Sequence, residues 1–203
     1  MSSPLIEDHA LLSDQRAAAL VTREGDIDWL CLPRFDSDAM FCALLGTEEH
    51  GHWSLRIADG EVLSRRYLPS TMVMETVWRS PTGTATVTEF MPITDGGTGS
   101  GRTTAAGAAT HDEATGGAAT GATPGSSPGS ASSLAGDVDD LADLVRSVEC
   151  LEGEVEVVQE LKIRFEYGQA VPWVRRGEDV AGDQVLIAVA GGDGIALHGP
   201  ALT

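Results

Sequence analysis

The chain has 203 residues, with 13 basic and 31 acidic side chains and a formal net charge of −18 at pH 7. Such a charge repels nucleic-acid phosphate and anionic membrane surfaces, which argues against both as partners. Apolar residues make up 42% of the chain, enough for a folded core, and no apolar run approaches the roughly 18 residues of a membrane span.

The N-terminal region carries no secretory signal that the sequence reveals. Glu7 and Asp8 stand where a signal peptide would have its basic and apolar regions. The three cysteines, Cys31, Cys42 and Cys150, are odd in number and contain no Cys-x-x-Cys pair. They are therefore predicted to be small, buried hydrophobic residues with free thiols in a reducing compartment, which indicates a cytoplasmic protein.

The stretch before residue 96 is predicted to be mainly β-structure. Residues 23–26 contain a glycine between two short apolar runs, which is typical of a hairpin, and residues 80–83 read Ser-Pro-Thr-Gly, a turn signal. Residues 39–45 are expected to form a helical turn or two. The predicted strands cover 17–22, 27–32, 51–57, 64–68, 72–79 and 84–91.

Residues 96–135 differ in composition from the rest of the chain. Of these forty residues, ten are Gly, ten Ala, seven Thr, six Ser and two Pro. So few large side chains cannot offset the entropy of ordering the backbone, so we expect a long disordered insertion. Residues 125–129 match the Gly-x-Ser-x-Gly nucleophile motif, but in this context the match has no catalytic meaning.

The clearest periodicity of the chain lies between residues 154 and 167. Apart from Val158 and Gln159, apolar and charged side chains alternate there, which predicts one long strand with one wet face. Residues 144–151 and 185–190 suit neighbouring antiparallel strands. The sequence therefore predicts an all-β fold, an antiparallel β-sandwich interrupted by the insertion.

The densest group of polar and aromatic residues follows a predicted strand. That strand passes through Trp29 and ends at a proline, after which a loop presents Arg34, Phe35, Asp36 and Ser37. Aromatic rings beside charged groups suit a sugar, because the ring covers the apolar face of the pyranose while the charges bind its hydroxyls. In the alternative interpretation, Arg34 and Asp36 only brace the loop, while Trp29 and Phe35 fill the core.

Two further groups have open interpretations. Trp173 lies in residues 171–176, which form either an aromatic and basic contact for another domain or an edge strand blunted by proline and charge. His50 and His52 would share a strand face, but the sequence indicates no third ligand for a metal. No metal or other cofactor is expected.

Six stretches of the chain carry a resemblance to a known family: 4–14, 25–37, 90–92, 143–146, 167–168 and 171–174. Taken in order, they resemble the N-terminal region of bacterial glucoamylase/trehalase-type enzymes of glycoside hydrolase family 15. The resemblance implies a β-sandwich of the super-sandwich type, the trehalase-like N-terminal domain, followed by an (α/α)6 catalytic barrel. It also implies hydrolysis of α-glucosidic bonds in trehalose or α-glucans with inversion, through two carboxyl groups of the barrel.

From this resemblance we expect residues 1–203 to be a single N-terminal domain, a fragment incomplete at its C-terminus, without the barrel. It would have no catalytic residue and be inactive alone. Its partners would be the catalytic domain of the full-length chain and a glucoside substrate. The alternative is an autonomous, non-enzymatic β-sandwich module that binds carbohydrate or protein. The candidate residues for the substrate pocket or the domain interface are Trp29, Arg34, Phe35, Asp36, Ser37 and Trp173.

Overall fold

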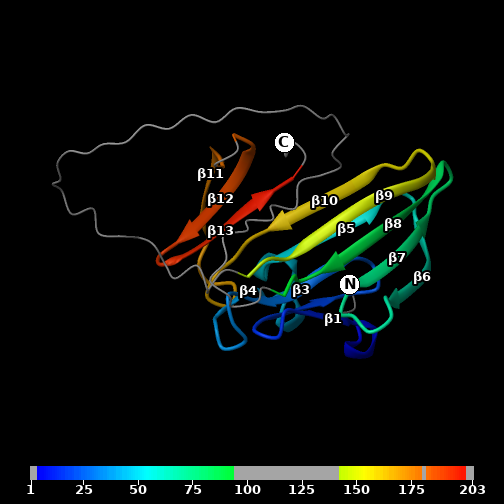
Figure 1. The fold of residues 1–203 in the computed structure, drawn as a ribbon. Helices are drawn as coiled ribbons and strands as arrows, with labels where there is room; N and C mark the ends of the chain where they lie inside the picture. The colour runs from blue at the N-terminus through cyan, green and yellow to red at the C-terminus, as the bar shows by residue number, and fades with distance from the viewer. Residues whose placement is uncertain (1–3, 94–141, 180–181, 200–203) are drawn as a thin grey trace, which may run out of the picture.

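The computed structural model describes residues 4–93, 142–179 and 182–199. Within these ranges the chain forms thirteen β-strands and three short 3-10 turns, with no α-helix. All strand pairs are antiparallel and belong to three sheets (Figure 1). The predicted all-β fold is confirmed, whereas the insertion predicted at 96–135 lies outside the described residues. The described part of the chain contains no helix long and apolar enough to cross a membrane.

The largest sheet has six strands in the order β1-β2-β3-β5-β10, with β4 paired to β3. The predicted hairpin at 23–26 joins β2 to β3, and Gly25 adopts a φ of 86° there. A Cβ atom at Gly25 would collide with the backbone carbonyl of Leu55, so glycine is needed at this position. The strands are β1 (Ala10–Ser13), β2 (Ala18–Val21), β3 (Asp26–Cys31), β4 (Ala39–Phe41), β5 (His52–Ile57) and β10 (Val157–Lys162).

The second sheet has four strands in the order β6-β7-β8-β9. The predicted turn at 80–83 joins β7 to β8, and the Ser80 N–H donates to the Gly83 carbonyl over 2.8 Å. β8 and β9 are paired along their length, from Gly83 opposite Gly153 to Phe90 opposite Val145. The strands are β6 (Glu61–Tyr67), β7 (Met74–Arg79), β8 (Gly83–Phe90) and β9 (Val145–Gly153).

The two larger sheets form the layers of a sandwich (Figure 1). One buried cluster joins β5 to β7 and β8 through Leu55, Trp78 and Val87, and a larger one lies over β1 to β4. Complete burial of such side chains stabilises the fold by about 1.5–3 kcal/mol each. The larger cluster consists of Ala10, Leu12, Ala17, Ala19, Val21, Ile27, Leu30, Met40, Phe41, Trp53, Met74, Met91 and Phe165.

A third sheet has three strands, β11 (Trp173–Glu178), β12 (Gln184–Ala190) and β13 (Asp193–His198), in that order. Ala190, Ile195 and Leu197 point to the same side of this sheet and pack against the larger cluster. β11 lies at the edge of this sheet, as one interpretation of residues 171–176 predicts, and a contact of these residues with another domain stays a prediction.

The structure corrects two predicted elements. The long strand predicted over 154–167 is only β10, because Glu166 and Tyr167 adopt φ values of 52° and 55° and form a turn. Phe165 pairs with Ala170 across that turn in an isolated bridge. Residues 39–45 form no α-helix: β4 is followed by a single 3-10 turn, η2 (Ala43–Leu45), and Ala39 pairs with Cys31 of β3.

Candidate functional site

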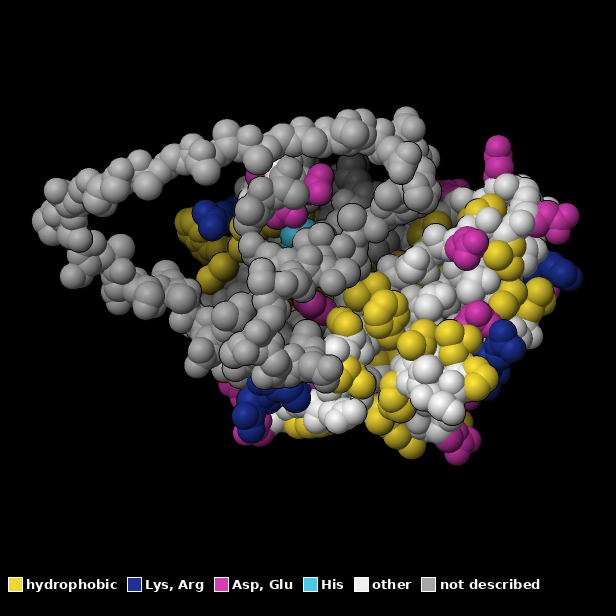
Figure 2. Space-filling model, viewed as in Figure 1, with side chains coloured by type: hydrophobic (Ala, Val, Ile, Leu, Met, Phe, Trp, Pro, Cys, Tyr) yellow, Lys and Arg dark blue, Asp and Glu magenta, His cyan; other side chains and the backbone are white. Residues whose placement is uncertain are grey.

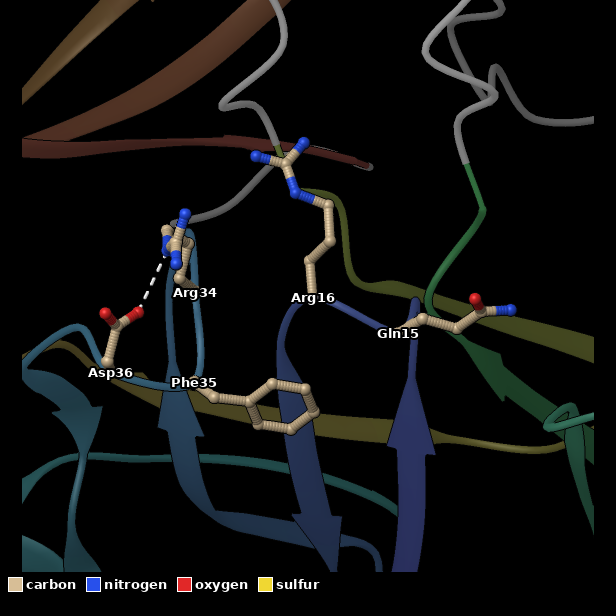
Figure 3. Close-up of a pocket in the computed structure, with 5 residues that line it drawn as sticks. All are labelled: Gln15, Arg16, Arg34, Phe35 and Asp36. Carbon is tan, nitrogen blue, oxygen red and sulfur yellow. Dashed lines mark hydrogen bonds and ion pairs between the residues drawn. The ribbon is translucent and has the colours of Figure 1, made fainter.

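A pocket of about 370 Å³ lies where two loops of the largest sheet meet (Figure 3). The turn between β1 and β2 contributes Gln15 and Arg16, and the loop after β3 contributes Arg34, Phe35 and Asp36. Figure 3 shows the guanidinium groups of Arg16 and Arg34 on the same side of the Phe35 ring. The pocket thus combines cationic hydrogen-bond donors with an apolar ring face.

Short-range hydrogen bonds fix the turn between β1 and β2. The Asp14 Oδ1 atom accepts from the backbone N–H groups of Arg16, at 2.8 Å, and Ala17, at 2.7 Å. The Ser13 hydroxyl donates to the Ala17 carbonyl over 2.8 Å. Gln15 has a φ of 77°, a left-handed conformation that a non-glycine residue adopts only when its surroundings hold it. The position of Arg16 therefore depends on the Asp14 carboxylate.

The loop after β3 is braced internally and tied to this turn. It begins with a cis peptide bond between Leu32 and Pro33. The Phe35 N–H donates to the Arg16 carbonyl over 2.8 Å, which joins the two loops. The Arg34 N–H donates to the Ser37 hydroxyl over 3.1 Å. These bonds tie the residues at the pocket rim to one another where β1, β2 and β3 end or begin.

Asp36 is the one carboxylate among the residues that line the pocket. The Arg34 Nε–H donates to its Oδ1 over 2.9 Å, and this hydrogen bond lowers the pKa of Asp36, so the group is ionised at neutral pH. Both side chains are exposed, and solvent screening keeps their contribution to stability small. The other lining residues, Gln15, Arg16, Arg34 and Phe35, supply hydrogen-bond donors and an aromatic ring.

The structure brings together three of the six predicted site residues. Arg34, Phe35 and Asp36 line the pocket, and the Ser37 hydroxyl supports Arg34 from within the same loop. The Arg34 and Asp36 side chains form an ion pair within this loop. Phe35 does not fill the core, since 59% of it is exposed.

The two predicted tryptophans lie elsewhere. Trp29 is half-buried against a small cluster that includes the free thiols of Cys31 and Cys42, and its ring centroid is 6.4 Å from that of Tyr167. Trp173 lies on β11 of the third sheet. They therefore belong to separate surroundings and do not join the pocket.

Sequence reasoning missed Gln15 and Arg16. They lie about twenty residues before the predicted loop, and only pairing of β2 with β3 brings them beside it. A signal was present, because Ser13 and Asp14 are residue types that fold back on the backbone and make turns. That signal indicates the turn but not its neighbour in space.

The two histidines considered as metal ligands are bound to the protein itself. His50 ends the 3-10 turn η3 (Glu48–His50) and its Nδ1 accepts from the Thr47 N–H over 3.0 Å. The His52 Nδ1 donates to the Glu48 carbonyl over 3.1 Å. Among the residues that the structure describes, no three His, Cys, Asp or Glu side chains are grouped to hold a metal ion.

A buried polar pair lies near the start of the largest sheet. The His9 Nε2 atom is 2.9 Å from the Asp28 Oδ2, and their side chains are 1% and 7% exposed. Burial raises the pKa of Asp28, although the hydrogen bond and the charge of His9 act in the other direction. Both side chains are enclosed, so we assign them to the fold and not to a solvent-accessible site.

A second buried pair joins the sheets. Arg146 of β9 is completely buried and pairs with Glu89 of β8 over 2.6 Å. Its Nη1 and Nη2 groups donate to the carbonyls of Trp53, at 2.8 Å, and Gly25, at 2.6 Å. Burial lowers the pKa of Arg146, and the Glu89 carboxylate opposes that effect. The guanidinium carbon also lies 5.1 Å from the centroid of the Trp53 ring.

Residues 1–106 match the family model described as "Trehalase-like, N-terminal". The chain is 43% identical over 81 residues to a trehalase of Mycobacterium tuberculosis. The aligned stretch covers 39% of this chain and 12% of the relative. It is 40% identical over 81 residues to a trehalase of Mycolicibacterium smegmatis, with the same coverage of 39% and 12%. A trehalase of Thermoplasma volcanium is 31% identical over 97 residues, or 46% of this chain and 16% of the relative. No solved structure matches the chain significantly.

Proposed function

The chain belongs to the trehalase-like N-terminal domain family, and from this premise we propose that it is the non-catalytic β-sandwich part of a glycoside hydrolase. The proposed enzyme cleaves α-glucosidic bonds in trehalose or α-glucans with inversion. The observation that carries the proposal is the family match, which includes both loops of the pocket. The similar trehalases are far longer, since the matched stretch spans only 12% of each mycobacterial protein.

Within this proposal, residues 1–203 form one domain, 96–135 are an insertion in it, and a separate (α/α)6 domain supplies both catalytic carboxyl groups. The pocket loop from Arg34 to Ser37 would face that catalytic domain and shape either the sugar pocket or the interface. The pocket chemistry supports this role, because guanidinium donors and an exposed aromatic ring suit sugar hydroxyls and domain contacts equally.

A cytoplasmic location belongs to the same proposal. Cys31, Cys42 and Cys150 are all free thiols, and the first two are buried. Free thiols are the usual state of cysteine in a reducing compartment.

The first test asks whether the chain is catalytic. The purified chain is incubated with trehalose and with maltose, and released glucose is measured beside an active trehalase. We expect no glucose above the buffer blank. Turnover that persists after repeated purification and disappears on heating would overturn the non-catalytic assignment.

The second test asks what the pocket loop does. The chain replaces the N-terminal region of the Mycobacterium tuberculosis trehalase, and the double substitution Arg34→Ala with Asp36→Ala is introduced into this chimera. If the loop faces the active site, kcat/KM for trehalose falls about tenfold, equal to about 1.4 kcal/mol, with an unchanged melting temperature.

The matched control removes another exposed ion pair. Arg66 and Glu75 pair over 2.7 Å on the second sheet, away from the pocket. Their double substitution by alanine should leave kcat/KM within about twofold, a difference of about 0.4 kcal/mol. Equal kinetics in the two double variants would contradict the proposed role of the loop.

The alternative, an autonomous carbohydrate-binding module, is favoured by one observation, the exposed Phe35 ring beside two arginines. Calorimetric titration of the chain with trehalose and maltooligosaccharides separates the two functions. Sugar binding that Phe35→Ala abolishes, together with unchanged kinetics of the pocket variants in the chimera, would favour the module.

A further inference from the structure

The outer edge of the third sheet carries large apolar side chains that are exposed to solvent and do not pack in the core. Trp173, the first residue of the edge strand β11, is 88% exposed. Val171 and Val174 beside it are 68% and 58% exposed. In Figure 2, hydrophobic and basic side chains gather beside this sheet. Trp and Arg on an apolar surface are the residue types that dominate binding at protein interfaces.

The strand register divides this sheet into two faces. Trp173 pairs with Val189, and Arg175 pairs with Ile187, so these four side chains share one face. The opposite face packs on the core through residues of β12 and β13. Val189 is 41% exposed on the face of Trp173. The sheet is therefore open to solvent around Trp173, whereas Val185, further along the same face, is buried. The outer edge of β11 has no partner among the described residues.

We propose that the outer edge of β11 binds an extended acidic segment of a partner protein as a fourth strand, with Trp173 as its anchor. An edge strand offers backbone N–H and C=O groups to such a segment, and side-chain contacts select it. This interaction surface is separate from the pocket and does not depend on the proposed hydrolase function.

The positive charge of Arg175 favours an acidic segment as the added strand. Arg175 is exposed on the Trp173 face, and no described residue forms an ion pair with it. A glutamate or aspartate opposite Arg175 in the added strand would form a cross-strand pair, and an apolar residue two positions away would cover Trp173. Such opposite-charge pairs on adjacent strands stabilise a sheet.

In two of the possible registers the same charges disfavour a second copy of this chain as the occupant. If β11 paired with itself in antiparallel fashion with Trp173 near Glu178, Arg175 would stand opposite Arg176 of the other copy. A shift by one position would place Arg175 opposite Arg175. Like charges that face each other across strands are destabilising.

Protection of the sheet against aggregation does not explain all the exposed residues at the β11 edge. Pro172 and the arginines are residue types that blunt an edge against aggregation. Pro172 precedes the strand, however, and leaves the six residues Trp173–Glu178 in extended conformation. Protection gives no reason for an almost fully exposed tryptophan at the start of that strand.

The test uses the whole chain and a short, end-blocked, dye-labelled peptide, followed by fluorescence anisotropy. Along one face of the extended peptide valine and glutamate alternate, and threonine occupies every position between them. The comparison peptide has lysine in place of glutamate. We expect the acidic peptide to bind and to slow amide hydrogen exchange over Trp173–Glu178. Trp173→Ala and Arg175→Glu should each raise the Kd of the acidic peptide at least tenfold. Such a rise is a loss of about 1.4 kcal/mol of binding free energy.

Matched controls come from β6, the edge of the second sheet. Leu63→Ala and Arg66→Glu change an exposed apolar and an exposed basic residue there, and should leave the Kd unchanged. Absent binding, equal binding of the lysine peptide, or equal effects of the β6 variants would overturn the proposal. A dimer in analytical ultracentrifugation that Trp173→Ala dissociates would also overturn it, in favour of a second copy.

Discussion

The Arg146 side chain is charged and completely buried between the two larger sheets. It is a fully buried cation on β9 that binds Glu89 and two backbone carbonyls of the opposite sheet. Those carbonyls belong to Trp53 and Gly25, so one guanidinium connects both layers of the sandwich. A buried ion pair of this kind need not be more stable than an apolar pair, but removal of one partner leaves an uncompensated charge.

We predict that Arg146→Ala lowers the free energy of unfolding by about 3–5 kcal/mol, because the Glu89 carboxylate, 2% exposed, loses its counter-charge. Urea titration followed by tryptophan fluorescence measures this change. The control is Arg66→Ala, which breaks a surface ion pair and should cost at most about 1 kcal/mol. A loss of similar size in both variants would show that the Arg146 pair is not enclosed.

Single residues also show which features of the structure cannot be predicted from the sequence. The motif Asp143-Leu144-Val145-Arg146 supports the family resemblance, yet nothing in it indicates a buried cation, because arginine is usually exposed. Burial of Arg146 depends on Glu89, which is 57 positions away in the chain. Phe35 is the reverse case, since an aromatic residue favours the core by its type but is exposed at the pocket.

At the scale of elements, the turn between β1 and β2 decides the shape of the pocket. Asp14 is 7% exposed and accepts two backbone N–H groups, those of Arg16 and Ala17. These bonds hold Gln15 in its left-handed conformation and place the Arg16 carbonyl to accept from Phe35.

We predict that Asp14→Ala lowers the free energy of unfolding by about 1–3 kcal/mol, because two buried N–H groups lose their acceptor. Asp14→Asn keeps an acceptor oxygen at the same position and should cost about 1 kcal/mol less. Thermal unfolding by circular dichroism compares the variants. Identical losses for alanine and asparagine would mean that the bonds to Oδ1 do not hold the turn.

Local patterns predicted short elements better than long ones. The hairpin at 23–26 and the turn at 80–83 follow from glycine and proline at fixed positions, and both are confirmed. The alternation over 154–167 identified a strand but not its end, since side-chain pattern cannot show that Glu166 and Tyr167 turn the backbone. The pocket needed strand pairing to bring two loops together, which no local pattern contains.

At the scale of the whole molecule, net charge opposes compactness. A charge of −18 on 203 residues produces repulsion that is long-ranged at low ionic strength, where the screening length is about 30 Å at 0.01 M salt. At about 0.15 M the screening length falls to about 8 Å, and the buried pair of Arg146 and Glu89 is screened little.

We therefore predict that the melting temperature rises by about 2–4 °C between low and physiological salt. This rise corresponds to an increase of about 1 kcal/mol in the free energy of unfolding. Differential scanning calorimetry measures it, and sodium and potassium chloride at equal ionic strength should agree if screening is the cause. A melting temperature that falls with salt would indicate that surface ion pairs outweigh the net repulsion.

The pairing of β8 with β9 also bears on how this family can vary. Phe90, at the end of β8, lies opposite Val145, at the start of β9, so the chain leaves the sheet and re-enters it at neighbouring positions. The closure of such a loop costs little more as it lengthens. Evolution can therefore lengthen or trim the sequence between these positions while the ladder stays intact. Protein engineers could use the same junction to graft a reporter domain.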